Sequence, residues 1–226
     1  MTDKKIKILT ISDHPLSPSG VGTQTKYMIE ALLKTGKFQV FSLAGAIKHN
    51  DYQMTKVEPY GEDWLIQPID GYGNQEMIRS VIRTEKPDIV WIMTDPRFWG
   101  WLWQMENEVR PLVPIVYYHV WDNYPYPYYN RKYYLSNDAI ATISKVSDDI
   151  VATTAPEVKR KYIPHAVDEK YFRPMSLEKI KELREISLHD QDREKIIFFW
   201  NNRNARRKHS GTLVWWFKEW LDKNDL

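Results

Sequence analysis

The sequence predicts an α/β protein in which a parallel, Rossmann-like sheet carries helices on both faces, followed by the start of a second such domain. Short β-branched apolar runs alternate with helical patterns along the chain. These runs are continuously apolar, which is typical of parallel strands buried on both faces. The length of 226 residues allows one to two domains, and the absence of cysteine excludes disulfides and thiolate metal sites.

The elements follow from apolar periodicity and punctuation. We expect strands at 6–11, 38–43, 88–93, 114–118, 139–143 and 161–163, with 64–66 ambiguous. We expect helices at 23–34, 76–85, 99–109, 177–186 and 210–222, and one more from an N-cap at Ser144 through residue 151. In a sheet of this kind, ligands bind outside the carboxyl ends of the strands.

A change of composition after residue 174 indicates a domain boundary. Residues 1–174 are expected to form the first Rossmann-like domain and 175–195 a polar, charged passage between domains. Residues 196–226 are expected to form the first β-α unit of an incomplete second domain, with a strand at 196–200. The chain would then be shortened, a natural fragment or one half of a split enzyme.

The last expected helix carries an apolar stripe that this incomplete domain would leave uncovered. The stripe consists of Leu213, Trp216, Phe217, Trp220 and Leu221. Self-association through helix 210–222 is the first expectation, ahead of folding back on residues 1–175 or poor order. The missing remainder of the second domain, in cis or in trans, is the other expected partner.

Charge and hydropathy exclude several function classes. The formal net charge of +2 does not indicate a nucleic-acid binder. The N-terminus does not resemble a signal peptide, and no apolar run reaches the roughly 20 residues of a transmembrane helix. We therefore expect a cytoplasmic protein, with a peripheral position at a membrane as the alternative.

Two candidate sites follow expected strands. Gly20, Val21 and Gly22 lie in the long turn before the first helix, where backbone N–H groups favour anions, although the dinucleotide fingerprint is absent. A flexible turn is the alternative. His119 follows the strand at 114–118, where ligands bind, and a capping or packing histidine is the alternative.

Two further stretches have an unusual composition. The aromatic tract at 121–134 offers flat faces for sugar rings or a partner surface, and a loop packed on its own rings is the alternative. Near the end of the chain, a basic loop suits phosphate oxygens because it follows an expected strand, and a solvated face is the alternative. The cations of this loop are Arg203, Arg206, Arg207 and Lys208.

Four motifs follow one another along nearly the whole chain. They are SPSGVG at 17–22, KPDIV at 86–90, YIPHAVD at 162–168 with FRP at 172–174, and NRNARRK at 202–208. Their order resembles glycosyltransferase family 4, the retaining nucleotide-sugar transferases with two facing Rossmann-like domains, the GT-B fold. The third motif departs from the family pattern because His165-Ala166 replaces Asn-Gly. The nucleotide-base pocket and the acidic pair of the second domain are not covered.

The resemblance implies a function and roles for residues. It implies transfer of a sugar from a nucleotide-diphosphate sugar to a sugar, lipid or protein acceptor, with retention of configuration and without a metal or other cofactor. Gly20, Val21 and Gly22 would line the cleft, and His119 would touch the donor sugar. Arg203 and Lys208 would grip the diphosphate and stabilise the leaving group. The isolated chain is expected to be inactive.

Two other functions remain open. The chain could be a non-catalytic binding or interaction module that retains the first Rossmann-like fold, with the aromatic tract as its partner surface. Another Rossmann-like enzyme, such as an oxidoreductase, is disfavoured by the missing dinucleotide fingerprint. The sequence does not determine the donor base, the sugar, the acceptor or the linkage.

Overall fold

The computed structural model describes residues 4–202 and 204–225. By its internal contacts the chain divides into two compact units, Met1–Val167 and Asp168–Leu226. The boundary falls earlier than the end of the first domain expected at residue 174.

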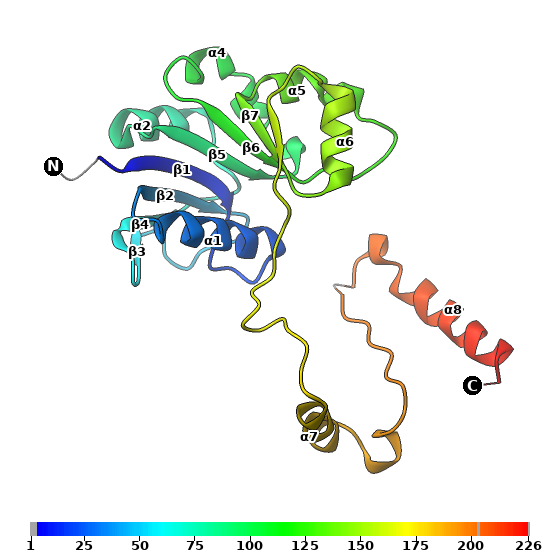
Figure 1. Ribbon diagram of the computed structural model, residues 1–226. Helices are drawn as coiled ribbons and strands as arrows, with labels where there is room; N and C mark the ends of the chain where they lie inside the picture. Colours follow the sequence, from blue (N-terminus) through cyan, green and yellow to red (C-terminus); the bar gives the residue numbers. More distant parts are fainter. Residues whose placement is uncertain (1–3, 203, 226) are drawn as a thin grey trace. The chain divides into compact units, whose positions relative to one another are not determined.

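The first unit is built on one sheet of eight strands in the order β3-β4-β2-β1-β5-β6-β7-β8 (Figure 1). The strands are β1 (Ile6–Asp13), β2 (Phe38–Gly45), β3 (Thr55–Val57), β4 (Gly61–Pro68), β5 (Ile89–Thr94), β6 (Ile115–His119), β7 (Ala139–Thr142) and β8 (Arg160–Tyr162). All neighbours pair in parallel except β3, which runs antiparallel to β4. The expected α/β fold with a parallel, Rossmann-like sheet is confirmed.

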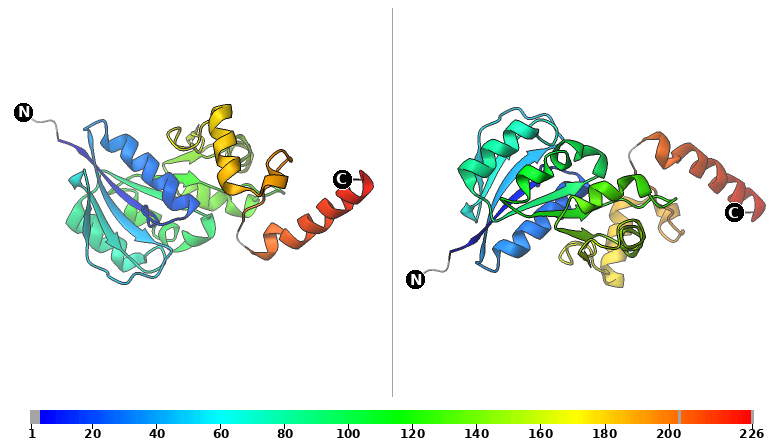
Figure 2. Two further views of the ribbon diagram at one scale, coloured as in Figure 1. Left: turned by 90° about the horizontal axis from the view of Figure 1, so that it is seen from below. Right: turned by 90° about the horizontal axis from the view of Figure 1, so that it is seen from above.

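Helices cover both faces of this sheet (Figure 1). They are α1 (Gly20–Leu33), α2 (Gln75–Glu85), α3 (Gly100–Trp103), α4 (Glu106–Val109), α5 (Arg131–Leu135) and α6 (Lys145–Thr154), with 3-10 turns η1 (Pro96–Phe98) and η2 (Tyr128–Asn130). The apolar side of α1 packs on one face, in a cluster with Trp64, Trp91 and Tyr118. The other helices pack on the opposite face, and Figure 2 views the arrangement from both sides.

Two expected helices differ from the observed ones. The first begins at Gly20 instead of residue 23, because the Ser19 side chain accepts a hydrogen bond from the Gly22 N–H and caps the helix there. The helix expected at 99–109 is divided into α3 and α4, because Met105 leaves the helical conformation with φ −112° and ψ 20°. The expected N-cap at Ser144 is confirmed by its bond from the Ser147 N–H.

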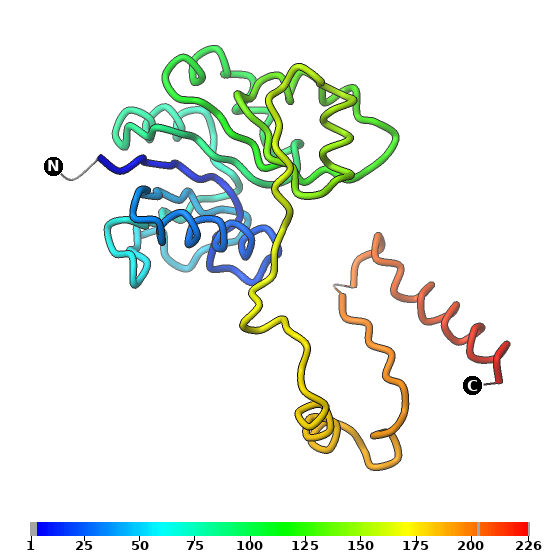
Figure 3. Tube along the Cα trace, viewed as in Figure 1, coloured from blue at the N-terminus to red at the C-terminus, as the bar shows by residue number. Residues whose placement is uncertain are grey.

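The second unit contains helices α7 (Leu177–Ser187) and α8 (Ser210–Lys223) and 3-10 turns η3 (Asp190–Asp192) and η4 (Arg206–Lys208). The strand expected at 196–200 is not formed: the described part of this unit contains no strand, and the segment is an extended trace between η3 and α8 (Figure 3). Its Phe198 ring packs on α8 instead, 4.7 Å from the Phe217 ring and 6.0 Å from the Trp220 ring between centroids. A strand needs a hydrogen-bonded neighbour, which apolar sequence alone does not supply.

No helix in the described ranges is both long enough and apolar enough to cross a bilayer.

Candidate functional site

The carboxyl ends of the parallel strands lie at one edge of the sheet in the first unit, which we call the carboxyl edge. Strands β1, β2, β4, β5 and β6 all end there, and the segments that follow them form the loops of this edge (Figure 1). Ligands of open parallel sheets bind in this position. The carboxyl edge is therefore the candidate site.

A buried carboxylate organises the centre of this edge. Asp13, the last residue of β1, is 9% exposed. One of its oxygens accepts a hydrogen bond from the Tyr72 hydroxyl at 2.7 Å, and the other accepts one from the Ser19 hydroxyl at 2.7 Å. The Ser19 oxygen in turn accepts the Gly22 N–H at 2.8 Å. Asp13 thus fixes both the start of α1 and the loop before α2.

The half-buried position of Tyr72 next to Asp13 changes the pKa of its hydroxyl. Both residues were missed by the sequence analysis. Burial, followed by the hydrogen bond to Asp13, raises the pKa of Tyr72 well above its usual value, so the phenol stays protonated and donates. Neither Asp13 nor Tyr72 was predicted as a site residue. An acidic residue at a strand end, six positions before a serine N-cap, is the signal that could have identified Asp13.

The two glycines of the first turn have different environments. A Cβ atom on Gly22 would lie 2.5 Å from the carbonyl oxygen of His14, so this position requires glycine for packing. A Cβ atom on Gly20 would meet nothing within 4 Å, and Gly20 is exposed. Val21 between them is partly buried against the α1 cluster. Of the two glycines of this turn, Gly20 is the one that presents open backbone at the carboxyl edge.

His119 does not face an open cleft, contrary to expectation. Its side chain is 0% exposed and points to the face opposite α1, together with Tyr117, because residues two apart on a strand share a face. Its Nε2 atom pairs with the Tyr134 hydroxyl at 2.8 Å, and its Nδ1 atom has no hydrogen-bond partner in the part of the chain described. Burial lowers the pKa of His119 to about 3, which keeps the ring neutral.

The aromatic tract is divided between packed and open rings. The hydroxyls of Tyr124 and Tyr126 both donate to the Asp149 carboxylate on α6, at 3.3 and 2.8 Å. Tyr128 and Tyr129 remain exposed. Hydrogen bonds thus tie Tyr124 and Tyr126 to α6, and a role of the exposed rings in binding stays a prediction.

The end of the first unit crosses the α1 side of the carboxyl edge. The Gln24 side chain on α1 donates to the Ala166 carbonyl at 2.6 Å and accepts from the Ala166 N–H at 3.2 Å. The Tyr118 hydroxyl donates to the Ile163 carbonyl at 2.8 Å, and the His165 ring packs edge-on against Tyr118. Burial lowers the pKa of His165. The motif that departs from the family pattern therefore lies beside α1.

The predicted phosphate-binding cations belong to the second unit. Lys208 ends η4, and His209 separates it from the start of α8. Arg203 lies outside the described residues. Their expected role stays a prediction.

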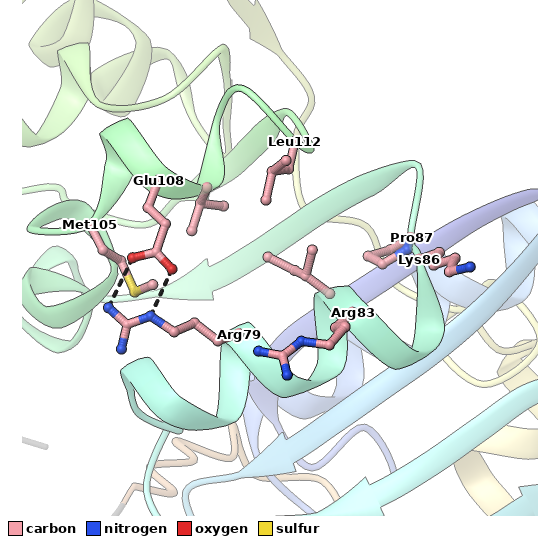
Figure 4. A pocket seen from close by; sticks show the side chains of 9 residues that line it. Arg79, Arg83, Lys86, Pro87, Met105, Glu108 and Leu112 are labelled. Carbon is pink, nitrogen blue, oxygen red and sulfur yellow. Dashed lines mark hydrogen bonds and ion pairs between the residues drawn. The ribbon is translucent and has the colours of Figure 1, made fainter.

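Two hollows of similar size lie at opposite edges of the sheet. One, of about 600 Å³, lies at the carboxyl edge among the loops after β2, β4 and β5, and we call it the edge hollow. The other, of about 510 Å³, lies between α2 and α4 (Figure 4), where Arg79 forms a bidentate pair with Glu108. Its lining includes Pro87 and Leu112, which precede the amino ends of β5 and β6, so it lies away from the carboxyl edge.

Within residues 4–202 and 204–225, no group of three or more His, Asp or Glu side chains could hold a metal ion. Metal independence stays a prediction. No protein-family model matches the chain, and no curated protein matches it significantly. The fold and the edge together define an α/β protein with a Rossmann-like sheet and a candidate ligand site at the carboxyl ends of its strands.

Proposed function

We propose that this chain acts in a retaining glycosyltransferase of the family 4 type, which moves a sugar from a nucleotide-diphosphate sugar to an acceptor. The order of the four motifs and the Rossmann-like sheet support the proposal. The observation that carries it is the start of α1, where an exposed glycine and a firmly anchored cap meet at the carboxyl edge.

The start of α1 suits a phosphate group. The Gly22 N–H is taken by the Ser19 hydroxyl and the Thr23 N–H by the Ser19 carbonyl. Helix geometry leaves the N–H groups of Gly20 and Val21 without an intrahelical acceptor. These donors and the positive end of the helix dipole favour an anion, and the open space at Gly20 lets a ligand approach the backbone.

The remaining roles follow from the resemblance. Arg203 and Lys208 would contact the donor diphosphate and stabilise the negative charge that develops on the leaving group. Each charge-assisted contact would contribute about 1.5–3 kcal/mol. His119 is buried and points to the face opposite α1, so no contact with the donor sugar is proposed for it.

A substitution at Gly20 separates phosphate binding from folding. Gly20→Asp places a carboxylate at the start of α1, where it stabilises the helix by about 0.3–1 kcal/mol and repels a phosphate. We expect the affinity for UDP, GDP or inorganic pyrophosphate, measured by calorimetry, to fall at least tenfold, with an unchanged or higher melting temperature. Gly20→Asn is the matched neutral control and should retain most of the affinity.

Two results would reject the proposal. One is an absence of diphosphate binding by the parent chain at millimolar concentration. The other is equal affinity of Gly20→Asp and the parent.

The second candidate function is a non-catalytic binding module, favoured by the complete burial of His119 and the exposure of Tyr128 and Tyr129. The two functions predict different results. A binding module would not bind diphosphates, and substitution of its exposed tyrosines would weaken association with a partner.

A further inference from the structure

The edge hollow has the composition of a site for a neutral, polyhydroxylated ring. Its volume of about 600 Å³ lies within the range of about 300–1,000 Å³ usual for small-molecule sites. Aromatic side chains form part of its lining and charged or backbone groups another part. The residues that carry the argument are Lys48, Asp70, Gly71, Tyr72, Phe98 and Trp101.

The aromatic part is held rigidly. The Tyr72 ring lies 4.9 Å from the Phe98 ring and 5.4 Å from the Trp99 ring between centroids. Trp99 is fully buried, and the Tyr72 hydroxyl is tied to Asp13. Phe98 nevertheless stays 47% exposed. A fixed aromatic ring that remains in water offers a flat apolar surface for a ligand.

The polar part has one group of each charge. Lys48 is exposed and forms no ion pair within the described ranges. The Asp70 carboxylate accepts the Tyr52 hydroxyl at 2.6 Å through one oxygen, Oδ1. Gly71 has a φ of 59° and open space where a Cβ would lie, so a ligand could approach its backbone.

This combination discriminates between ligand classes. A phosphate or another anion would meet the Asp70 carboxylate, and a purely apolar chain would desolvate the Lys48 ammonium group without giving it a partner. A pyranose ring has an apolar face for Phe98 and hydroxyls that both donate to a carboxylate and accept from an ammonium group. The requirements of the hollow therefore match a sugar ring.

We propose that the edge hollow binds a sugar ring of the acceptor, so that the acceptor is a saccharide or carries one. The sugar-binding part stands on the hollow alone, whereas the word acceptor rests on the proposed function. Tyr72 connects the two because it lines the hollow and hydrogen-bonds to Asp13, which in turn fixes the start of α1.

Saturation-transfer NMR on the full chain tests the proposal, with methyl glycosides of glucose, galactose, mannose and N-acetylglucosamine as probes. We expect at least one to bind with millimolar affinity, with the strongest transfer to the protons of one ring face. Phe98→Ala should weaken this binding about two- to tenfold. Phe98→Tyr should retain it, because the aromatic face is kept.

Further variants keep the test decisive. Lys48→Met removes an exposed ammonium group without shortening the side chain, and should weaken binding about two- to tenfold even where Phe98→Ala fails to fold. Leu112→Ala, in the hollow at the other edge, should leave binding unchanged. Absence of transfer to every glycoside, or equal affinity of Lys48→Met and the parent, would overturn the proposal.

The transferase function and the sugar site in the edge hollow can fail independently, and the two experiments distinguish these outcomes. If glycosides bind through Phe98 and Lys48 but Gly20→Asp does not alter pyrophosphate affinity, the sugar site stands and the transferase function falls. If pyrophosphate affinity depends on Gly20 but no glycoside binds, the sugar site falls and the function stands.

Discussion

Replacing Asp13 by alanine tests whether one carboxylate fixes the carboxyl edge. The substitution removes two hydrogen bonds of 2.7 Å, from Tyr72 and Ser19, to a carboxylate that is 9% exposed. Each bond to a charged group contributes about 1.5–3 kcal/mol. Tyr72 and Ser19 are only half-buried and recover part of this by binding water. We therefore expect the free energy of unfolding of the first unit to fall by about 2–4 kcal/mol.

The assay is native-state hydrogen exchange at the backbone amides of Leu9 and Ile11, which lie in the middle of β1 and are fully buried. Such amides exchange by global opening and report the stability of this unit alone. Tyr72→Phe should cost about 1–2 kcal/mol and should cost little in the Asp13→Ala background. Additive effects of the two substitutions would show that Tyr72 and Asp13 do not stabilise each other and would refute the reasoning.

Three other predictions concern separate parts of the chain. Because the pKa of His119 is about 3 when folded and 6.5 when unfolded, stability should fall as the pH drops from 6.5 toward 3, by up to about 1.4 kcal/mol per unit. His119→Gln should lose this slope in urea unfolding at several pH values. Gln24→Ala should accelerate hydrogen exchange of the Ala166 amide, because both side-chain bonds to Ala166 are lost. The chain should self-associate through α8 in sedimentation experiments, and Trp216→Glu should abolish this because Trp216 is exposed; a monomeric parent would contradict it.

The inner strands of the sheet could be predicted because they are buried on both faces and therefore carry few polar interruptions. Strands β1, β2, β5, β6 and β7 were expected from apolar runs, the exposed edge strand β8 was expected as a short strand at 161–163, and the ambiguous segment at 64–66 lies in β4. The missed strand is β3, whose residues Thr55–Val57 are largely exposed at the edge of the sheet. Its pairing with β4 comes from backbone hydrogen bonds, which leave no apolar pattern.

The prediction of a strand at 196–200 was wrong because it rested on the apolar pattern alone. Its apolar residues satisfy the pattern of a buried strand, but a strand also requires a neighbour with free backbone groups. The described part of the second unit supplies none, and Phe198 packs on α8 instead. The pattern determines which residues avoid water and leaves open what covers them.

The positions of site residues were predicted less well than the strands that carry them. The sequence placed His119 correctly at the carboxyl end of a strand, yet its side chain points into the core. The alternation of a strand puts His119 on the same face as Tyr117, and only the packing of Tyr134 over that face shows that it is covered. Asp13 escaped notice because its partner Tyr72 is distant in sequence.

The contacts of Asp13 give the two halves of the candidate site a common support. The start of α1, where an anion is proposed to bind, and the edge hollow, where a sugar ring is proposed to bind, are both held by the same carboxylate. Ser19 and Tyr72 each donate to one oxygen of Asp13, and these two hydrogen bonds position the cap of α1 and the ring that lines the edge hollow. Loss of either hydroxyl should therefore weaken binding of a phosphate at Gly20 as well as stability, which ties the geometry of the edge to its proposed chemistry.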